Sequence, residues 1–197
     1  MPHPISLSLI EPAAERNRLT SFFRPILAIP HLIWVALWGV AAVITAAIGW
    51  FVVVVRGRMP LWAHQFIARY VRYVTHVYGY AALVVDQYPR FFGAAGYPLD
   101  AAILAPAEQN RWQAGFRLIL ALPAMIFAQV LQDVLIVVVV FSWFVILVTG
   151  RQFDGLVHIA TWIIRVQVQT LAYLGLLTER YPRIDIEQSG GLQAAPA

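Results

Sequence analysis

The sequence contains no cysteine, which excludes disulfides, thiolate metal ligands and thiol nucleophiles. Lysine is absent as well, so arginine supplies all 14 basic side chains. Charge is scarce: 12% of the 197 residues are charged, against about 25% in soluble domains. No phosphate-binding loop, nucleotide fingerprint or catalytic triad order is present. We therefore expect a protein that is not an enzyme and that has no cofactor, no metal site and no nucleic-acid partner.

Two long segments are almost free of charge. From Ile26 to Val55 the only ionisable side chain is His31, and from Leu118 to Val148 it is Asp133. A helix needs about 20 apolar residues to cross a bilayer, and a soluble core helix of such length would need a polar face. Residues 1–10 lack the basic and apolar regions of a signal peptide. The sequence therefore predicts an all-α membrane protein whose first long segment stays as an anchor.

The chain repeats itself at a spacing of 93 residues, without a gap from Asn17 to Phe91. Apolar bias alone would not bring tryptophan, arginine, glycine, tyrosine and proline into one register. The matches include Asn17 with Asn110, Phe23-Arg24 with Phe116-Arg117, Trp50 with Trp143, Gly57-Arg58 with Gly150-Arg151, Arg72 with Arg165, Tyr80 with Tyr173, and Tyr88-Pro89-Arg90 with Tyr181-Pro182-Arg183. The sequence predicts two tandem copies, 1–92 and 98–186, with a linker at 93–97 and a disordered tail at 187–197.

Each copy has the same predicted order of elements. A short alternating segment outside the membrane comes first, with Ile5, Leu7 and Leu9 in copy one and a weaker version between Pro98 and Pro106 in copy two. A long helix follows, at 26–55 or 118–148. A second helix, at 61–85 or 156–178, then ends before a Tyr-Pro-Arg motif because proline cannot donate to the helical ladder. The expected fold is about four long helices in two tandem hairpins.

The topology depends on how many spans one copy contains. Two spans per copy give parallel copies, and an odd number gives inverted copies. We favour two spans, with a second helix that lies flat in the interface as the alternative. Under two spans, eight arginines lie on the side of both termini (Arg16, Arg18, Arg24, Arg90, Arg111, Arg117, Arg180, Arg183) and three on the other (Arg56, Arg58, Arg151). This excess favours a multi-pass protein with both termini in the cytoplasm.

The second helices carry a polar stripe. The candidate site residues share one helical face in each copy. They are Gln65, Arg69, Arg72 and His76 in copy one, at spacings of four, three and four, and His158, Arg165 and Gln169 in copy two, where Trp162 completes the same spacing. The stripe could face lipid headgroups, could form an internal polar seam between the hairpins, or could mark helix ends from which arginines extend to water.

The second long segment carries an acid that the first lacks. Asp133 follows Gln129 by one turn, and the equivalent of Asp133 in copy one is Val40. A carboxylate within the membrane is a functional candidate by default. Three interpretations remain open: a structural pair with Arg72 or Arg165, ion or proton handling, and a position near water.

The copies resemble the DUF4389 family of bacterial membrane proteins. The motifs that carry the resemblance are Arg18-Leu19, Leu27–Ile33, Trp50-Phe51 and Gly57–Pro60 in copy one, and Ile164–Val166, Tyr173-Leu174 and Leu176–Pro182 in copy two. Copy two departs at its turn, where Gln152-Phe153 replaces Met59-Pro60. The resemblance implies a multi-pass protein of the bacterial inner membrane and brings no assigned reaction.

Two functions are compatible with these features. The first is a non-enzymatic membrane protein that binds lipid or serves as an accessory or assembly subunit, with membrane lipids, another membrane protein or a second copy of itself as partners. The second is a small transporter or channel with a polar site at Asp133 and Arg72/Arg165, because repeats often build such sites.

Overall fold

The computed structural model describes residues 4–10, 16–94 and 96–184. The fold is predominantly helical, as the apolar segments predict. The elements are β1 (Ile5–Leu9), α1 (Arg18–Arg56), α2 (Leu61–Ala81), β2 (Leu99–Ile103), α3 (Arg111–Gly115), α4 (Arg117–Thr149) and α5 (Asp154–Leu174). The tail predicted at 187–197 lies outside the described residues.

The two longest helices have well-defined ends. The Asn17 side chain accepts hydrogen bonds from the backbone of Leu19 and Thr20 at the start of α1. Gly57 ends α1 and Gly150 ends α4, each with a φ above 70° that glycine adopts without steric cost. Both helices are long and apolar enough to cross a membrane.

The second helices end earlier than the sequence predicts. Helix α2 ends at Ala81 rather than 85, and α5 ends at Leu174 rather than 178. Just beyond these ends, Leu83 and Leu176 adopt φ values near 60° and turn the chain away from the helix axis. The proline of each Tyr-Pro-Arg motif lies past this turn and does not end the helix.

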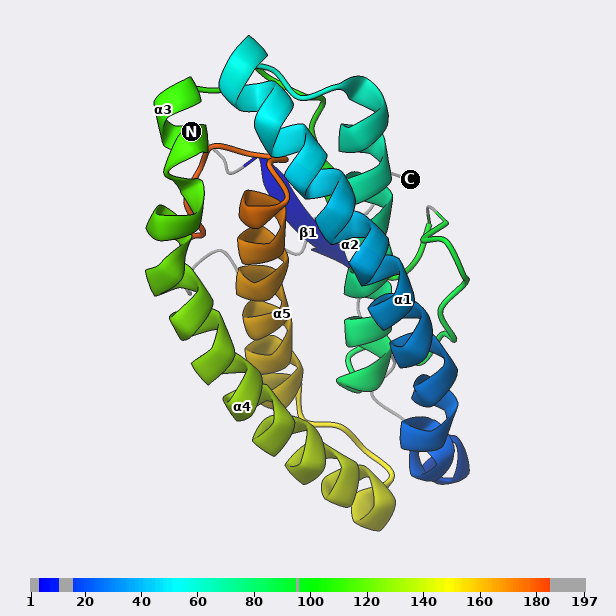
Figure 1. Ribbon diagram of the computed structural model, residues 1–197. Coiled ribbons are helices and arrows are strands. Elements are labelled where there is room, and N and C mark those ends of the chain that lie inside the picture. The colour runs from blue at the N-terminus through cyan, green and yellow to red at the C-terminus, as the bar shows by residue number, and fades with distance from the viewer. Residues whose placement is uncertain (1–3, 11–15, 95, 185–197) are drawn as a thin grey trace.

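The elements form three layers. Helices α1 and α4 lie in front in Figure 1, α2 and α5 pack against them and against each other, and the strands lie behind. The strands form an antiparallel two-stranded ribbon in which Leu7 pairs with Ala101 at the centre. Strand β1 packs on α5 and β2 packs on α2, so each copy lends its strand to the second helix of the other copy.

The two copies are inverted, and the predicted parallel arrangement is wrong. Helices α1 and α4 are antiparallel: the Arg16 N–H donates to Gly150 O (3.0 Å) at one end of the pair, and the Gln109 N–H donates to Gly57 O (2.8 Å) at the other. The Trp143 indole adds a bond to Ser21 O at the first end. The reason is the ribbon, which carries the chain back along the helices before α4 begins.

The inversion removes the basis of the predicted orientation. The arginines near the start of α1 lie beside the turn that follows α4. The arginines near the start of α4 lie beside the turn that follows α1. One end of the helix pair holds Arg16, Arg18, Arg24 and Arg151, and the other holds Arg56, Arg58, Arg111 and Arg117. The turns after α2 and α5 add Arg90 to the first end and Arg180 and Arg183 to the second. The count is then five against six, and the excess of eight over three no longer favours either orientation.

Candidate functional site

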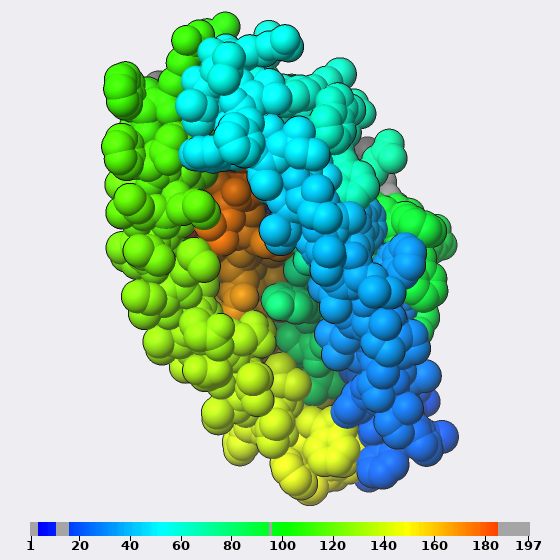
Figure 2. Space-filling model, in the orientation of Figure 1, coloured from blue at the N-terminus to red at the C-terminus, as the bar shows by residue number. Residues whose placement is uncertain are grey.

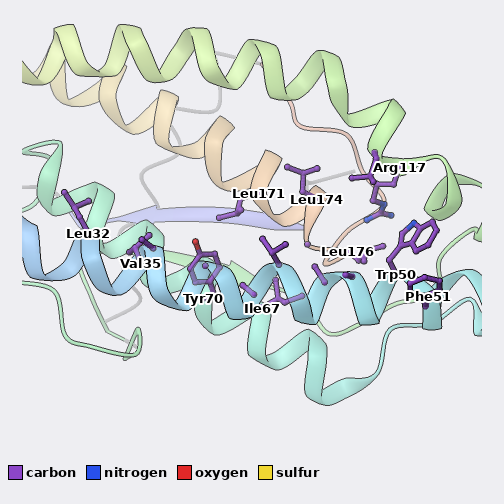
Figure 3. A pocket seen from close by; sticks show the side chains of 18 residues that line it. Leu32, Val35, Trp50, Phe51, Ile67, Tyr70, Arg117, Leu171, Leu174 and Leu176 are labelled. Carbon is purple, nitrogen blue, oxygen red and sulfur yellow. The ribbon is translucent and has the colours of Figure 1, made fainter.

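An apolar groove of about 680 Å³ opens between α1 and α4. Figure 2 shows it as a hollow between the two long helices, with α5 visible on its floor. Small residues of α1 form much of one wall, Tyr70 and Ile67 of α2 contribute to the floor, and Trp50 and Arg117 lie at one end (Figure 3). The groove lies in the size range of ligand sites, about 300–1,000 Å³.

A second, smaller groove of about 260 Å³ lies toward the opposite end of the helix pair. All of its lining residues are repeat equivalents of residues that line the first groove. They are Arg24, Pro25, Ala81, Leu83, Val139, Val140, Trp143 and Phe144, which correspond to Arg117, Leu118, Leu174, Leu176, Ala46, Ala47, Trp50 and Phe51. The inverted repeat therefore provides one groove per copy.

Side-chain volume differs between the two grooves at two positions of the wall. Ala46 and Ala47 on the wall of the larger groove correspond to Val139 and Val140 in the smaller one. Gly39 leaves room for the Tyr70 hydroxyl, which would lie 2.8 Å from an added Cβ. Ala46 and Ala47 thus occupy less space in the larger groove than Val139 and Val140 occupy in the smaller one.

A buried arginine closes one end of each groove. In copy one the Arg24 guanidinium donates to Tyr80 O (3.4 Å) and Val85 O (3.0 Å), and it pairs with the Asp86 carboxylate. Arg16 pairs with the same carboxylate. These bonds satisfy carbonyls at the C-terminal end of α2 and fasten it to the start of α1.

In copy two, Arg117 takes the place of Arg24 with a different partner. It donates to Tyr173 O (2.8 Å) and Thr178 O (3.0 Å), and its third bond goes to the neutral amide of Gln109 (2.9 Å). Gln109 is the equivalent of Arg16. The candidate residues taken from the sequence did not include these arginines, although the exact match of Arg24 and Arg117 in the repeat was a signal that could have identified them.

The polar stripe of the second helices divides into a buried and an exposed half. His76 is fully buried and lies 3.1 Å from Asp100 Oδ1, and its equivalent Gln169 donates to Ile5 O (3.4 Å). Both therefore contact the strand of the other copy. Gln65, Arg69 and His158 are exposed, and Arg165 is half-buried. The buried half of the stripe therefore forms an internal polar seam. This seam contacts the two-stranded ribbon and not a long helix.

Asp100 is the ionic partner of this seam. Arg72 Nε lies 3.1 Å from Asp100 Oδ1. Burial opposes ionisation of Asp100, but the hydrogen bond from His76 and the charge of Arg72 outweigh it, so the pKa of Asp100 lies below its usual value. This acid has little signal in the sequence, because it lies in the weaker strand segment and its equivalent in copy one is Ser6.

Asp133 does not pair with Arg72, so that predicted pair is wrong. Asp133 is exposed on α4, and its carboxylate accepts a hydrogen bond from Gln129 (3.4 Å), one turn away on the same helix. Arg72 is engaged by Asp100. The structure therefore keeps Arg72 apart from the Asp133 carboxylate.

The front and back of the molecule differ in polarity. The exposed large side chains are apolar along α1 from Leu19 to Val55, and along α4 from Leu118 to Val148 apart from Gln129 and Asp133. The back carries the ribbon, with Ser6 and Ser8 exposed, and the Arg72–Asp100 pair. The grooves open on the apolar side.

Comparison with known families agrees with the repeat. The family model described as Domain of unknown function (DUF4389) matches residues 18–93 and 111–184. The chain belongs to the DUF4389 family. It contains two tandem DUF4389 copies, and the residues that anchor α2 and α5 through the buried arginines lie within the matched segments. No curated protein and no solved structure matches the chain.

Proposed function

We propose that the protein is a non-enzymatic membrane protein that contacts lipid with the face formed by α1 and α4 and holds an acyl chain in the larger groove. The apolar groove between two lipid-compatible helices carries this proposal. Exposed apolar patches of this extent are typical of membrane or partner contact sites. The bacterial inner membrane expected from the sequence is part of the proposal.

The back of the molecule favours an arrangement in which the front face lies in the membrane and the back remains in water. A two-stranded ribbon leaves one backbone edge of each strand without a ladder partner, and lipid cannot satisfy such edges. The exposed Arg69 and Gln65 would also be costly in hydrocarbon. Length points the same way, because α1 has 39 residues and is about 58 Å long, whereas the hydrocarbon core is about 30 Å thick.

The transporter hypothesis receives no comparable support. It placed Asp133 in one site with Arg72 or Arg165, and Arg72 instead pairs with Asp100 against the ribbon. The groove is lined mainly by apolar side chains. We therefore propose lipid binding rather than ion or solute transport.

Cysteine labelling tests the membrane arrangement, because the chain has no cysteine of its own. Arg58→Cys and Arg151→Cys place one thiol at each end of the helix pair. If the front face lies in the membrane, a membrane-impermeant maleimide labels both variants from the same side of sealed membrane vesicles. Labelling from opposite sides would mean that α1 and α4 span the bilayer and would overturn the face-on arrangement.

Two further variants serve as controls. Val43 is an exposed residue of the front face, and Ser8 is an exposed residue of the ribbon. Val43→Cys is expected to react only after detergent is added, and Ser8→Cys is expected to react without it. If Val43→Cys reacts in intact vesicles as fast as Ser8→Cys, the front face is not in lipid and the proposed function fails.

A further inference from the structure

We infer that the larger groove binds the ionised form of a fatty acid, with the carboxylate at Arg117 and the acyl chain along the small residues of α1. This inference rests on the proposed function and specifies the ligand of the same groove. It depends on three observations: an open hydrogen-bond donor at the end of the groove, a charge that lacks a directly paired acid, and a difference between the two copies.

The Arg117 side chain has donor capacity left. Arginine carries five N–H donors, and three bonds from its terminal nitrogens are made, to Tyr173 O, Thr178 O and the Gln109 amide. Among the described residues, nothing accepts a hydrogen bond from Nε. The residue is only 2% exposed, yet it lines the groove, and Figure 3 shows its guanidinium directed toward Trp50 at the groove end.

The charge of Arg117 is not paired directly. Among the described residues, no carboxylate oxygen lies within 4.0 Å of its guanidinium. Glu179, the equivalent of Asp86, instead accepts a hydrogen bond from the backbone N–H of Asn110. A buried cation stabilises an anion that reaches it, and a charge-assisted hydrogen bond is about twice as strong as a neutral one.

Copy one supplies an internal comparison. Arg24 also leaves its Nε without a partner among the described residues, but its terminal nitrogen is paired with Asp86. The groove beside it is also smaller, and Val139 and Val140 occupy the positions of Ala46 and Ala47 there. Of these two grooves, the larger one combines open space with a guanidinium that has no directly paired acid among the described residues.

The burial of Arg117 selects the type of headgroup. Only a compact anion can reach a guanidinium that is 2% exposed, so a carboxylate fits better than a bulky phosphodiester. The lining beyond Arg117 includes Ala42, Ala46 and Leu171, which favour a hydrocarbon chain over polar groups. These features match a single-chain amphiphile with a carboxylate end.

Two ligands with the same chain separate the role of charge from that of the groove. Delipidated protein in a neutral detergent is titrated with oleate and with oleyl alcohol at pH 8, and binding is counted by native mass spectrometry. We expect one oleate per chain, bound at least about tenfold more tightly than oleyl alcohol. Equal affinities would overturn the role of Arg117 but leave acyl binding standing, whereas no binding of either ligand would contradict the proposed function as well.

Variants of the groove walls test its location. Ala46→Val/Ala47→Val gives the larger groove the residues of the smaller one and is expected to weaken binding of both ligands at least about tenfold. Val139→Ala/Val140→Ala is the matched control and should leave the single oleate site unchanged. A second bound oleate in this control would show that space alone creates a site, which would overturn the role assigned to the directly unpaired charge.

A third variant tests the charge within the protein. The amide oxygen of Gln109 accepts a hydrogen bond from Arg117 at 2.9 Å. Gln109→Glu replaces this amide with a carboxylate, the group with which Asp86 pairs with Arg24 in copy one. We expect it to abolish the preference for oleate while oleyl alcohol binds as before. If circular dichroism shows that this variant does not fold, the comparison of the two ligands on the unmodified protein still decides the question; an unchanged preference in a folded variant contradicts the inference.

Discussion

At the scale of single residues, Arg24 shows how one side chain organises a helix end. It is 2% exposed and donates to one carbonyl in the last turn of α2, Tyr80 O, and to one just beyond the helix, Val85 O. Its ring contact with Tyr80, at 4.8 Å from the guanidinium carbon to the ring centroid, adds a cation–π interaction. Arg117 and Tyr173 repeat this arrangement at 4.7 Å in copy two.

Removing this side chain should destabilise the fold. Arg24→Met removes the guanidinium that donates to Val85 O and pairs with Asp86. We expect a loss of about 1.5–3 kcal/mol in the free energy of unfolding, the range for hydrogen bonds to charged groups. Denaturant unfolding in detergent measures it. Arg90→Met is the control, because Arg90 is exposed; an equal loss in both variants would show that Arg24 has no special structural role.

At the scale of the elements, α4 differs from α1 by one charge on its outer face. Asp133 is exposed halfway along α4, and the equivalent Val40 of α1 is 62% exposed. If the outer faces of α1 and α4 both contact lipid, the Asp133 carboxylate opposes membrane association. The cost is a few kcal/mol at most if the carboxylate lies near the membrane interface.

Substitutions at these two positions test whether both helices contact lipid. We expect Asp133→Leu to make the protein harder to extract from membranes by alkaline carbonate, and Val40→Asp to make it easier. The fraction extracted is measured by immunoblotting of pellet and supernatant. Asp133→Asn removes the charge at nearly constant size and separates charge from shape. A Val40→Asp variant that extracts like the unmodified protein would argue that α1 does not contact lipid at this point.

At the scale of the whole molecule, the two copies meet in an interface that is not fully symmetric. Ile67 of α2 packs against Gly175 at the end of α5, so closely that an added Cβ would lie 2.8 Å from Ile67 Cγ2. The repeat equivalents of this pair are Ala160 and Ala82. The first pair combines a large side chain with a glycine, whereas the equivalent pair consists of two alanines.

A double-mutant cycle tests this contact between the copies. Gly175→Ala should cost about 1–3 kcal/mol through overpacking, and Ile67→Ala about 2–4 kcal/mol through the cavity that it leaves. The double variant reproduces the Ala160–Ala82 pair, so we expect its cost to fall short of the sum by at least about 0.5 kcal/mol. Strict additivity in thermal unfolding would mean that the two residues do not contact each other.

The repeat and the apolar segments were sufficient to predict helical copies, because periodicity, caps and hydropathy act over a few turns of one helix. Gly57 and Gly150 end the long helices at the positions that the repeat marks. The ends of α2 and α5 were predicted less well, since they depend on Arg24 and Arg117 reaching from another helix.

By itself the sequence determined that this chain consists of two DUF4389 copies with long apolar helices, since identity at a fixed spacing and runs of apolar residues are local properties. Only the tertiary structure decided that the copies are inverted, because the same repeat is compatible with parallel packing until β1 pairs with β2. It also decided that Arg72 meets Asp100 rather than Asp133, and that small residues of α1 border an open groove beside Arg117. These contacts join residues far apart in the chain, and no local pattern specifies them.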